Sequence, residues 1–510
     1  MSFRKTTYHQ RGEFSMPNNL LPYKYEEAKT SSTLSSFAGL LVFLDFMRGL
    51  HFDKVLRQEL DMAEHANSLW KPSTIVANLL LLNLAGGDSV DDLQRLGDDP
   101  GMSRLLEKFY EVGLSVPALR KHRELKRRQA AGSVPAASTV FRFLKQDGLT
   151  GLEGRGQGKA FIPLSVDTVK RLCACNTQLI SALCANRAYD TITLDIDATL
   201  IETHKRDALY GYKGFSAYQP MNVWWAEQRV LLYTEFRDGN VPANFELKPV
   251  MEQALACLPK MDKPIFFRSD AAGYQIELLK FCDDKKIQFG VGCPISKEFR
   301  KAVQALPESA WHKLDKSREY AEVCFVPSSL ATTKKKKYEF RYIATRELID
   351  RQLMFFEAVE SVESEYPYPV MVLNGGRYKI HALVTNRAIP APELIKWYYK
   401  RCGNSEEAHG ILKNDLAGGA LPCNHYNANA IWWWVAVIAH NIHSAFKLLC
   451  CEESLQKSRL KGMRFRIINI AGLVIEHGRQ LIVRLNAGES AYRLLSKIRQ
   501  AICGLRPCPG

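Results

Sequence analysis

Three acidic segments carry the residues best suited to chemistry. Asp195 and Asp197 are two residues apart in the run TITLDIDATL, so in an extended strand both side chains project from the same face. Asp270 ends a second apolar run, KPIFFRSD, and a turn containing Gly273 follows it. Glu406 lies much later, in a polar stretch. Carboxylate oxygens are the ligands that hard divalent cations prefer, so these positions predict a metal site. The simpler alternative for any single aspartate is a helix cap or a turn former.

The stretch around Glu406, ELIKWYYKRCGNSEEAHGILKND (393–415), contains no proline and is predicted to form one helix. Glu406 and Lys413 are seven residues apart (413 − 406), or about two helical turns, and would share one face. The carboxylate could help to hold a metal, and the ammonium group could contact a phosphate. The alternative is a solvated helix face with ordinary ion pairs.

The order of these acids indicates a reaction class. Two strand-borne aspartates followed by a helix-borne glutamate are typical of two-metal phosphoryl transfer, which needs carboxylates around two cations about 4 Å apart. The charge balance, 69 − 54 = +15, and the pI near 9.1 favour an anionic partner, with nucleic acid first.

The elements that would position these acids follow from the hydrophobic pattern. Residues 34–110 are predicted to be helical, and 117–130 are dense in Lys and Arg. The next segment, VPAASTVFRFLKQD, predicts a short helix. Together these parts suit DNA binding of helix-turn-helix type, or else a solvated charged helix. The Gly-rich segment 149–161 is either a linker or an ordered, turn-rich segment.

Strands are predicted around the aspartates and again before the glutamate. Residues 188–201, 223–239 and 263–274 are predicted to contain strands, and 286–386 contain several short β-type runs. A strongly apolar helix carrying three consecutive tryptophans follows Asp415 and is predicted to be buried. Residues 456–510 are basic and predicted to be helical.

Cysteine usage and hydropathy bear on the compartment. The 13 cysteines form no pair of CxxC motifs, which indicates reduced cytosolic thiols. The polar, basic start MSFRKTTYHQRGEF does not resemble a signal peptide. The most apolar windows, 34–50 and 430–450, are interrupted by charged or polar residues, so we expect buried helices and no membrane span.

Several motifs occur in the order found in one enzyme family: GGDSVDDLQRLGDDPGM (86–102), VPAASTVFRF, LDIDAT, RSDAAGY, ALVTN, RCGNSEEAHGILKNDLAGG and the aromatic helix ending AHNI. The chain resembles bacterial insertion-sequence DDE transposases, in the branch with a ribonuclease-H-like core and a Tyr-Arg-Glu-Lys signature. The set it resembles most is the one described as group-one DDE transposase domains.

This resemblance implies that Asp197, Asp270 and Glu406 are the catalytic, metal-binding acids. Asp197 is preferred to Asp195 because the family's first acid tends to precede a short Thr-bearing turn, as in Asp197-Ala198-Thr199. Asp195 is expected to be a further metal ligand. Glu407 is the competing glutamate, about 100° around the helix.

The resemblance also implies DNA-phosphate contacts. Lys413 matches the signature lysine, and Tyr399 or Tyr398 matches the tyrosine. Arg401 lies one residue farther from the glutamate than the family spacing. We expect Lys413, Arg401, Tyr399 and Lys400 to contact phosphates.

The implied fold is α/β, with a ribonuclease-H-like mixed-sheet core, a strand-rich insertion, a helical N-terminal head and a helical C-terminal tail. The gap of 136 residues between Asp270 and Glu406 (406 − 270) exceeds what the core needs, and the strand-rich block fills it. The expected parts are a DNA-binding head at 1–150, the core at 151–285 and 387–450, the insertion at 286–386 and a basic tail at 451–510.

The expected activity is cut-and-paste DNA transposition with two Mg²⁺ ions, for which Mn²⁺ can substitute, and no organic cofactor. The expected partners are double-stranded DNA, both terminal inverted repeats and target, and a second copy of the chain in the DNA complex. The expected location is the bacterial cytoplasm, at the nucleoid. The alternatives are a ribonuclease-H-like nuclease that does not join strands, and a catalytically dead DNA-binding protein derived from a transposase.

Overall fold

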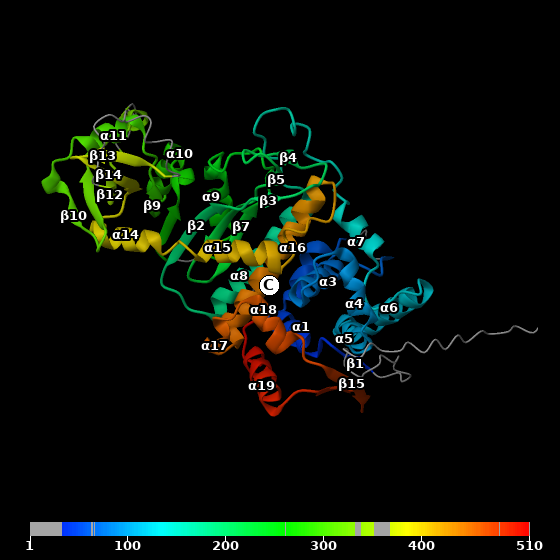
Figure 1. The fold of residues 1–510 in the computed structure, drawn as a ribbon. Coiled ribbons are helices and arrows are strands. Elements are labelled where there is room, and N and C mark those ends of the chain that lie inside the picture. The colour runs from blue at the N-terminus through cyan, green and yellow to red at the C-terminus, as the bar shows by residue number, and fades with distance from the viewer. Residues whose placement is uncertain are drawn as a thin grey trace, which may run out of the picture.

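A computed structural model describes residues 33–62, 65, 67–260, 262–331, 338–350, 368–478 and 480–508. The first 32 residues of the expected head, and parts of the expected insertion, lie outside these ranges. Figure 1 shows a helical region at one end, a strand-rich region at the other and a mixed region between them.

The central region is built on five strands that follow the order expected of a ribonuclease-H-like core. They are β2 (Ile192–Ala198), β6 (Met221–Trp225), β7 (Val230–Glu235), β8 (Ile265–Ser269) and β9 (Gln288–Gly292). In space they run β7-β6-β2-β8-β9. The first three pair antiparallel, whereas β8 is parallel to β2 and β9 is parallel to β8. Numbered by appearance, this is the order 3-2-1-4-5, and the predicted fold class is confirmed.

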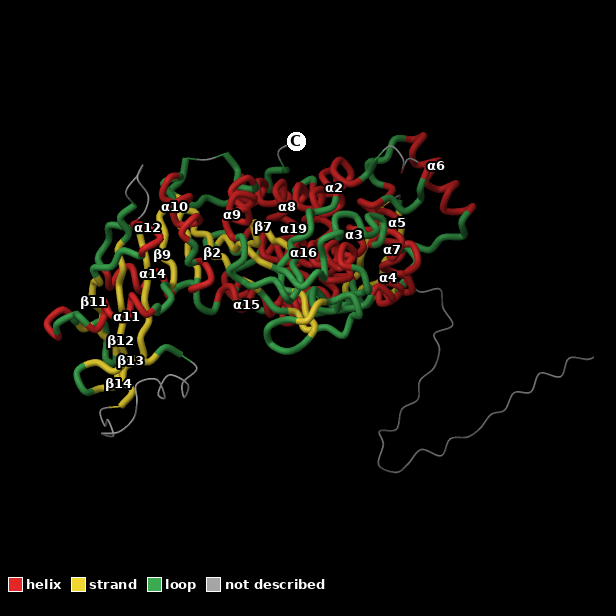
Figure 2. The backbone as a smooth tube through the Cα atoms, turned by 90° about the horizontal axis from the view of Figure 1, so that it is seen from above, coloured by secondary structure: helices red, strands yellow, loops and turns green. Residues whose placement is uncertain are grey.

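The strand-rich block continues this sheet instead of forming a separate one. Its strands are β10 (His312–Lys313), β11 (Arg318–Val323), β12 (Arg341–Asp350), β13 (Val370–Leu373) and β14 (Gly376–Thr385). Strand β14 pairs antiparallel with β9, so one sheet of ten strands runs from β10 to β7 (Figure 2). Because β9 is the fifth core strand, the inserted strands begin after Gly292.

Helix α16 (Tyr426–Cys450) joins the core to the head. It contacts α8 (Asp167–Asn186), α3 (Pro72–Ala85) and β7, which lie on different sides of it. The tryptophans Trp432, Trp433 and Trp434 are at most 1% exposed, which confirms the predicted burial. An apolar helix surrounded in this way ties head and core into one hydrophobic cluster.

The remaining helices of the head and core are α1 (Leu41–Gly49), α2 (Phe52–Leu60), α4 (Leu93–Asp98), α5 (Pro100–Glu111), α6 (Val116–Arg128), α7 (Ala137–Leu144), α9 (Leu247–Ala256) and α10 (Ile276–Asp284). Helices α11 (Lys297–Gln304) and α12 (Ser328–Ala331) belong to the strand-rich block. The basic helix α6 buries none of its residues and projects from the head in both views. Within the described ranges, no single helix has the length and apolarity of a membrane span; only the bent pair Pro72–Ala85 and Val90–Asp98, at 92°, meets those criteria jointly.

The C-terminal part differs from the predicted helical tail. After α17 (Glu453–Gln456), α18 (Leu460–Met463) and a π-helical turn, β15 (Gly472–His477) and β16 (Gln480–Leu485) form a hairpin that β1 (Leu34–Ser35) extends. Helix α19 (Glu489–Cys503) follows. In β16 partly buried and exposed residues alternate, which is the period-two pattern of a half-buried strand. All 13 cysteines are free thiols.

Candidate active site

Asp197 and Asp270 leave two adjacent parallel strands at the same level. Ile196 in β2 pairs with Ser269 in β8, and each aspartate is the next residue along its chain. Asp270 Oδ1 accepts a hydrogen bond of 3.0 Å from the backbone N–H of Ala272, so it caps the short 3-10 turn that follows β8. The strand ends therefore bring two carboxylates to one edge of the core.

Glu406 comes from a helix that is not the continuous one predicted for 393–415. The stretch forms α14 (Ala391–Tyr399), α15 (Asn404–Gly410) and the π-helical turn η6 (Ile411–Asp415). Gly403 has φ +87°, a conformation that glycine adopts without strain and that interrupts the helix. Its N–H donates to Glu406 Oε2 over 2.7 Å, so the carboxylate caps its own helix at an exposed position. The prediction of a single helix is wrong, because Gly403 was not recognised as a break.

The three acids are close enough to influence each other's charge. The pKa of Asp197 is raised to about 6, first by burial and second by the charge of Asp270; Glu406 adds to this rise and Arg401 opposes it. The neighbouring Glu407 acts elsewhere, since its charge raises the pKa of Lys447, which burial and Arg229 lower. The electrostatic cluster is therefore Asp197, Asp270 and Glu406.

Asp195 does not present its carboxylate to this cluster. Both of its oxygens accept hydrogen bonds from Arg268, Nε to Oδ1 over 2.6 Å and Nη2 to Oδ2 over 2.7 Å. Arg268 also donates to the carbonyl of Trp397, and Asp195 is fully buried. This placement conflicts with the expectation that Asp195 is a metal ligand, because its lone pairs already serve an internal ion pair.

Of the two tyrosines, Tyr398 is the one that lies beside the acids. Its hydroxyl lies near Gly292 and the turn after Asp270, and its ring lies 5.6 Å from the guanidinium carbon of Arg401. Tyr399 instead lies under Arg318, with 5.3 Å between guanidinium carbon and ring centroid, and lines a small hollow on the strand-rich block. The predicted tyrosine, Tyr399, is therefore directed away from the acids.

The predicted cations lie around the same edge. Burial lowers the pKa of Arg401, but Tyr398 and the charges of Asp270 and Asp197 raise it, and the net effect is a rise. The buried Nε of Arg401 has no hydrogen-bond partner in the part of the chain that the structure describes. Lys413 Nζ donates to the carbonyl of Leu200 over 3.3 Å, just beyond β2. Lys400 lies exposed in the break between α14 and α15.

A hydrogen-bonded chain that the sequence analysis did not identify ends at His409, which faces Asp197. Trp433 Nε1 donates to Thr234 Oγ1, which donates to Asn222 Oδ1. The Nδ2 of Asn222 lies 3.2 Å from His409 Nε2, so this ring nitrogen accepts and Nδ1 carries the hydrogen. Nδ1 lies 3.9 Å from Asp197 Oδ2. Burial lowers the pKa of His409 to about 4, with Lys413 adding to the effect, so the ring is neutral. The position of His409 three residues after Glu406 was the available signal.

The chemistry of the donor set fits a hard divalent cation. Asp197 and Asp270 lie side by side, and Glu406 is near enough for its charge to act on Asp197. Burial, Asp270 and Glu406 all raise the pKa of Asp197, and a dication would relieve the repulsion among the three acids. Among the described residues, however, no three acidic, histidine or cysteine side chains are arranged as a complete metal-binding group. The Glu406 carboxylate, held by Gly403, must turn toward the aspartates to complete one.

Comparisons with known proteins identify the family. The sequence matches the family described as "Transposase DDE domain group 1" over residues 26–507. No curated protein matches it. Among solved structures, it is similar to the piggyBac transposase synaptic complex with hairpin DNA, at 9% sequence identity and a TM-score of 0.39, covering 85% of this chain and 79% of the other.

Proposed function

Because the chain belongs to the family of group 1 transposase DDE domains, whose members are generally metal-dependent enzymes acting on DNA, we propose that it is a DNA transposase that cuts and joins the ends of its own mobile element. The observation that carries the proposal is the electrostatic coupling of Asp197, Asp270 and Glu406, since the charges of the other two acids raise the pKa of Asp197. They are far apart in sequence, yet the β2–β8 pairing and helix α15 bring their charges to one place.

Asp197, Asp270 and Glu406 are the residues proposed to hold two Mg²⁺ ions, and Mn²⁺ can substitute. Bound ions would supply positive charge beside the attacking and leaving oxygens of a phosphodiester. The chain supplies the rigid placement: two parallel strands fix the aspartates, and the neutral His409 approaches Asp197 through its N–H without adding a charge. We leave Asp195 out of the ligand set, since Arg268 occupies both of its oxygens.

The cations around the acids would hold the DNA phosphates. Arg401 is the best placed, because a buried guanidinium nitrogen there lacks a partner among the described residues and a phosphate oxygen would satisfy it. Tyr398 takes the signature tyrosine's place beside Arg401. Lys413 would exchange the Leu200 carbonyl for a phosphate, and Lys400 is exposed nearby. Tyr399 would contact DNA only where the DNA crosses the strand-rich block.

The basic helix α6, none of whose residues is buried, is the proposed contact of the head with the inverted repeats. The strand-rich block is a second candidate for this role. Work on two ends implies a second copy of the chain in the assembled complex, with target DNA as the further partner. We propose that the protein acts in the bacterial cytoplasm, at the nucleoid.

The test is metal-dependent nicking of DNA that carries the element's ends. We expect Mg²⁺-dependent nicking by the unchanged protein and its loss, by at least about 100-fold, in Asp270→Asn. The asparagine still accepts from the Ala272 N–H, so the turn is preserved. Asp262→Asn is the matched control, because Asp262 is exposed and precedes the opposite end of β8.

Two outcomes separate the alternatives. A precut end supplied with target DNA gives a joined product only from a transposase, so nicking without joining would favour a nuclease. Binding of end DNA without nicking under any divalent metal would favour the dead DNA-binding protein. Equal nicking by Asp270→Asn and the unchanged protein would refute the assignment of the acids.

A further inference from the structure

A small ribbon projects from the chain directly after the strand that carries Asp197. Residues 201–218, here called the ribbon, connect β2 to β6 and form a sheet of their own from β3 (Ile201–Glu202), β4 (Leu209–Tyr210) and β5 (Ser216–Tyr218), in the order β3-β5-β4. Figure 1 shows it beside the N-terminal end of α16. Lys413, in the signature segment, donates to the carbonyl of Leu200 at its base.

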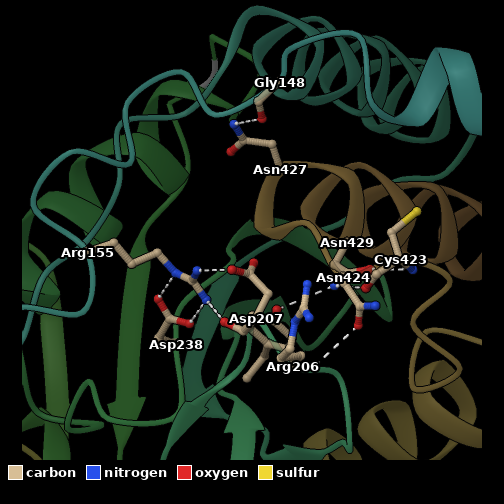
Figure 3. A network of polar contacts seen from close by, with 10 residues as sticks. Gly148, Arg155, Arg206, Asp207, Asp238, Cys423, Asn424, Asn427 and Asn429 are labelled. Carbon is tan, nitrogen blue, oxygen red and sulfur yellow. Dashed lines mark hydrogen bonds and ion pairs between the residues drawn. The ribbon is translucent and has the colours of Figure 1, made fainter.

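The base of the ribbon is held by a nearly buried ion-pair network. The guanidinium of Arg155 lies between two carboxylates, and its Nη1–Oδ1 distance to Asp207 and Nε–Oδ2 distance to Asp238 are both 2.7 Å (Figure 3). The side chain of Arg155 is 9% exposed and that of Asp238 is fully buried. Arg155 also lies over the ring of Tyr426, at the start of α16. The Gly-rich segment 149–161 is therefore an ordered, turn-rich segment that holds the base of the ribbon, and not a linker.

Further contacts fix the position of the ribbon against the body of the protein. The N–H of Arg206 donates to Asn424 Oδ1 over 3.3 Å (Figure 3). The N–H of Gly239 donates to the carbonyl of Ala217 over 2.8 Å, and a Cβ at Gly239 would meet that oxygen at 2.7 Å. The ribbon is therefore a well-anchored projection.

The tip of the ribbon presents two aromatic rings to solvent. Tyr210 is 67% exposed and Tyr212 is 73% exposed. Only three tyrosines in the described ranges are exposed, and the third is Tyr492 in α19, at 62%. The Tyr210 hydroxyl donates to the carbonyl of Gly214, which closes the tip. Two ordered tyrosines exposed on one turn are a ready surface for stacking.

The charge around these rings selects the partner. His204, Lys205, Arg206 and Lys213 are basic, and Lys213 Nζ lies 6.0 Å from the centroid of the Tyr212 ring. Of the two acids, Asp207 is paired with Arg155, which leaves Glu202. Exposed aromatic rings with interleaved basic side chains are typical of surfaces that bind single-stranded nucleic acid, where the rings stack on bases and the cations contact phosphates.

We propose that the ribbon is a binding surface for single-stranded DNA next to the active site, with Tyr210 and Tyr212 stacking on unpaired bases and Lys213 and Arg206 contacting the adjoining phosphates. The proposal rests on the proposed function for the identity of the nucleic acid. The ribbon follows β2, the β-strand that carries Asp197, directly along the chain. Single-stranded DNA bound to the two tyrosine rings would therefore have a fixed path toward the acids.

The experiment measures the binding of a fluorescent oligothymidine and of a duplex of the same length by anisotropy, without divalent metal. We expect Tyr212→Ala to weaken single-strand binding about tenfold and duplex binding less than twofold. Tyr212→Phe, which keeps the ring, should bind as the unchanged protein does. Tyr492→Ala is the matched control, because it removes an equally exposed tyrosine from α19, on the opposite side of the molecule (Figure 1).

Each result is decisive. Equal weakening by Tyr212→Ala and Tyr492→Ala, or unchanged single-strand binding, would overturn the proposal and leave the ribbon available to a protein partner. If Tyr212→Ala weakened duplex and single-strand binding to the same extent, base stacking would be refuted, and DNA binding would be assigned to charge–phosphate contacts alone. If the unchanged protein binds oligothymidine through Tyr212 but nicks no DNA, the proposed function fails while the ribbon proposal stands. If the protein nicks DNA and Tyr212→Ala binds oligothymidine normally, the ribbon proposal fails while the proposed function stands.

Discussion

Arg268 and Asp195 face each other across the parallel strands β8 and β2, joined by two hydrogen bonds of 2.6 and 2.7 Å at a place where both side chains are at most 3% exposed. Two residues farther along β2, Asp197 lies beside Asp270, whose charge raises the pKa of Asp197. One strand face thus carries an acid whose charge is neutralised internally and an acid whose charge repels its neighbours. These two environments predict opposite behaviour.

Asp195→Asn and Asp197→Asn should separate stability from activity. Asp195→Asn leaves a buried guanidinium with half of its partner, and breaking a buried pair costs about 3–5 kcal/mol in the free energy of unfolding. Asp197→Asn removes a repelled charge, so the free energy of unfolding should stay level or rise, while nicking is lost. Urea unfolding and a nicking assay on both variants measure this. If Asp195→Asn were stable but inactive and Asp197→Asn were active, Asp195 would be the metal ligand and the assignment of the two residues would be wrong.

Without divalent metal, the stability should fall as the pH rises through the titration of Asp197. The pKa of this carboxyl in the folded protein is raised to about 6, so the folded state binds a proton that the unfolded state releases near pH 4. Its contribution is fully present below about pH 4 and is lost by about pH 6, on the order of 2–3 kcal/mol. Urea unfolding in EDTA from pH 4 to 7 measures it. Asp197→Asn should lack this decline; an identical decline in the variant would assign it to another group.

Glu406→Gln should abolish nicking, and Glu407→Gln should not. The glutamine still accepts from the Gly403 N–H, so α15 remains capped, but it cannot bind a cation as a carboxylate does. We expect at least about a 100-fold loss of nicking for the first variant and less than about a threefold loss for the second, whose charge acts on Lys447. Steady-state nicking at saturating Mg²⁺ gives both values. Comparable losses would place the metal between both glutamates.

Thr234→Val should weaken Mg²⁺ binding through the hydrogen-bonded chain that ends at His409, beside Asp197. Valine has the shape of threonine but neither donates to Asn222 nor accepts from Trp433, so the orientation of His409 is no longer fixed. Groups that orient metal ligands typically contribute 10- to 100-fold in affinity, and we expect about a tenfold rise in the Mg²⁺ concentration for half-maximal nicking. The control is Thr193→Val, since Thr193 lies at the other end of β2 from Asp197 and its hydroxyl donates to Glu227, in the turn between β6 and β7. Equal effects of the two variants would indicate general destabilisation.

Much of the core could be predicted from sequence because its signals are local. The run TITLDIDATL alternates over the length of β2, and the apolar run before Asp270 ends where β8 ends. What could not be predicted depends on pairing between distant segments. The Thr-bearing turn after Asp197 favoured it over Asp195 only by resemblance to the family; the physical difference comes from Arg268, 73 residues after Asp195. Likewise, Gln288–Gly292 has the same texture as the inserted strands and is a core strand only because it pairs with β8.

The errors at the signature segment and at the C-terminus have a different physical origin. One glycine, Gly403, divides the predicted 393–415 helix, since its φ of +87° is costly for other residues. In the tail, the basic charge masked the alternation of Leu481, Val483 and Leu485 in β16. This strand pairs with β15, which pairs with β1 on its other side. In both places a short local feature, a glycine in one and a period-two alternation in the other, determines the structure where the sequence analysis predicted a longer helix.

Arg401→Gln should raise the upper limit of the pH range over which the metal-free protein loses stability, and should also weaken end-DNA binding. Arg401 is the one cation among the main influences on Asp197, and it lowers a pKa that burial, Asp270 and Glu406 raise. Without it the pKa of Asp197 rises further, so the decline in stability extends above about pH 6. Urea unfolding in EDTA measures the shift, and anisotropy with end DNA in Ca²⁺ measures the lost phosphate contact.

Arg387→Gln is the control, because Arg387 is a second partly buried arginine, stacked on Trp397 and Phe266, whose charge acts on Arg268 and Glu393 instead of the acids. An unchanged pH range in Arg401→Gln, or an equal shift in Arg387→Gln, would mean that Arg401 does not control the charge of Asp197, and would remove it from the proposed phosphate site if DNA binding were also unchanged.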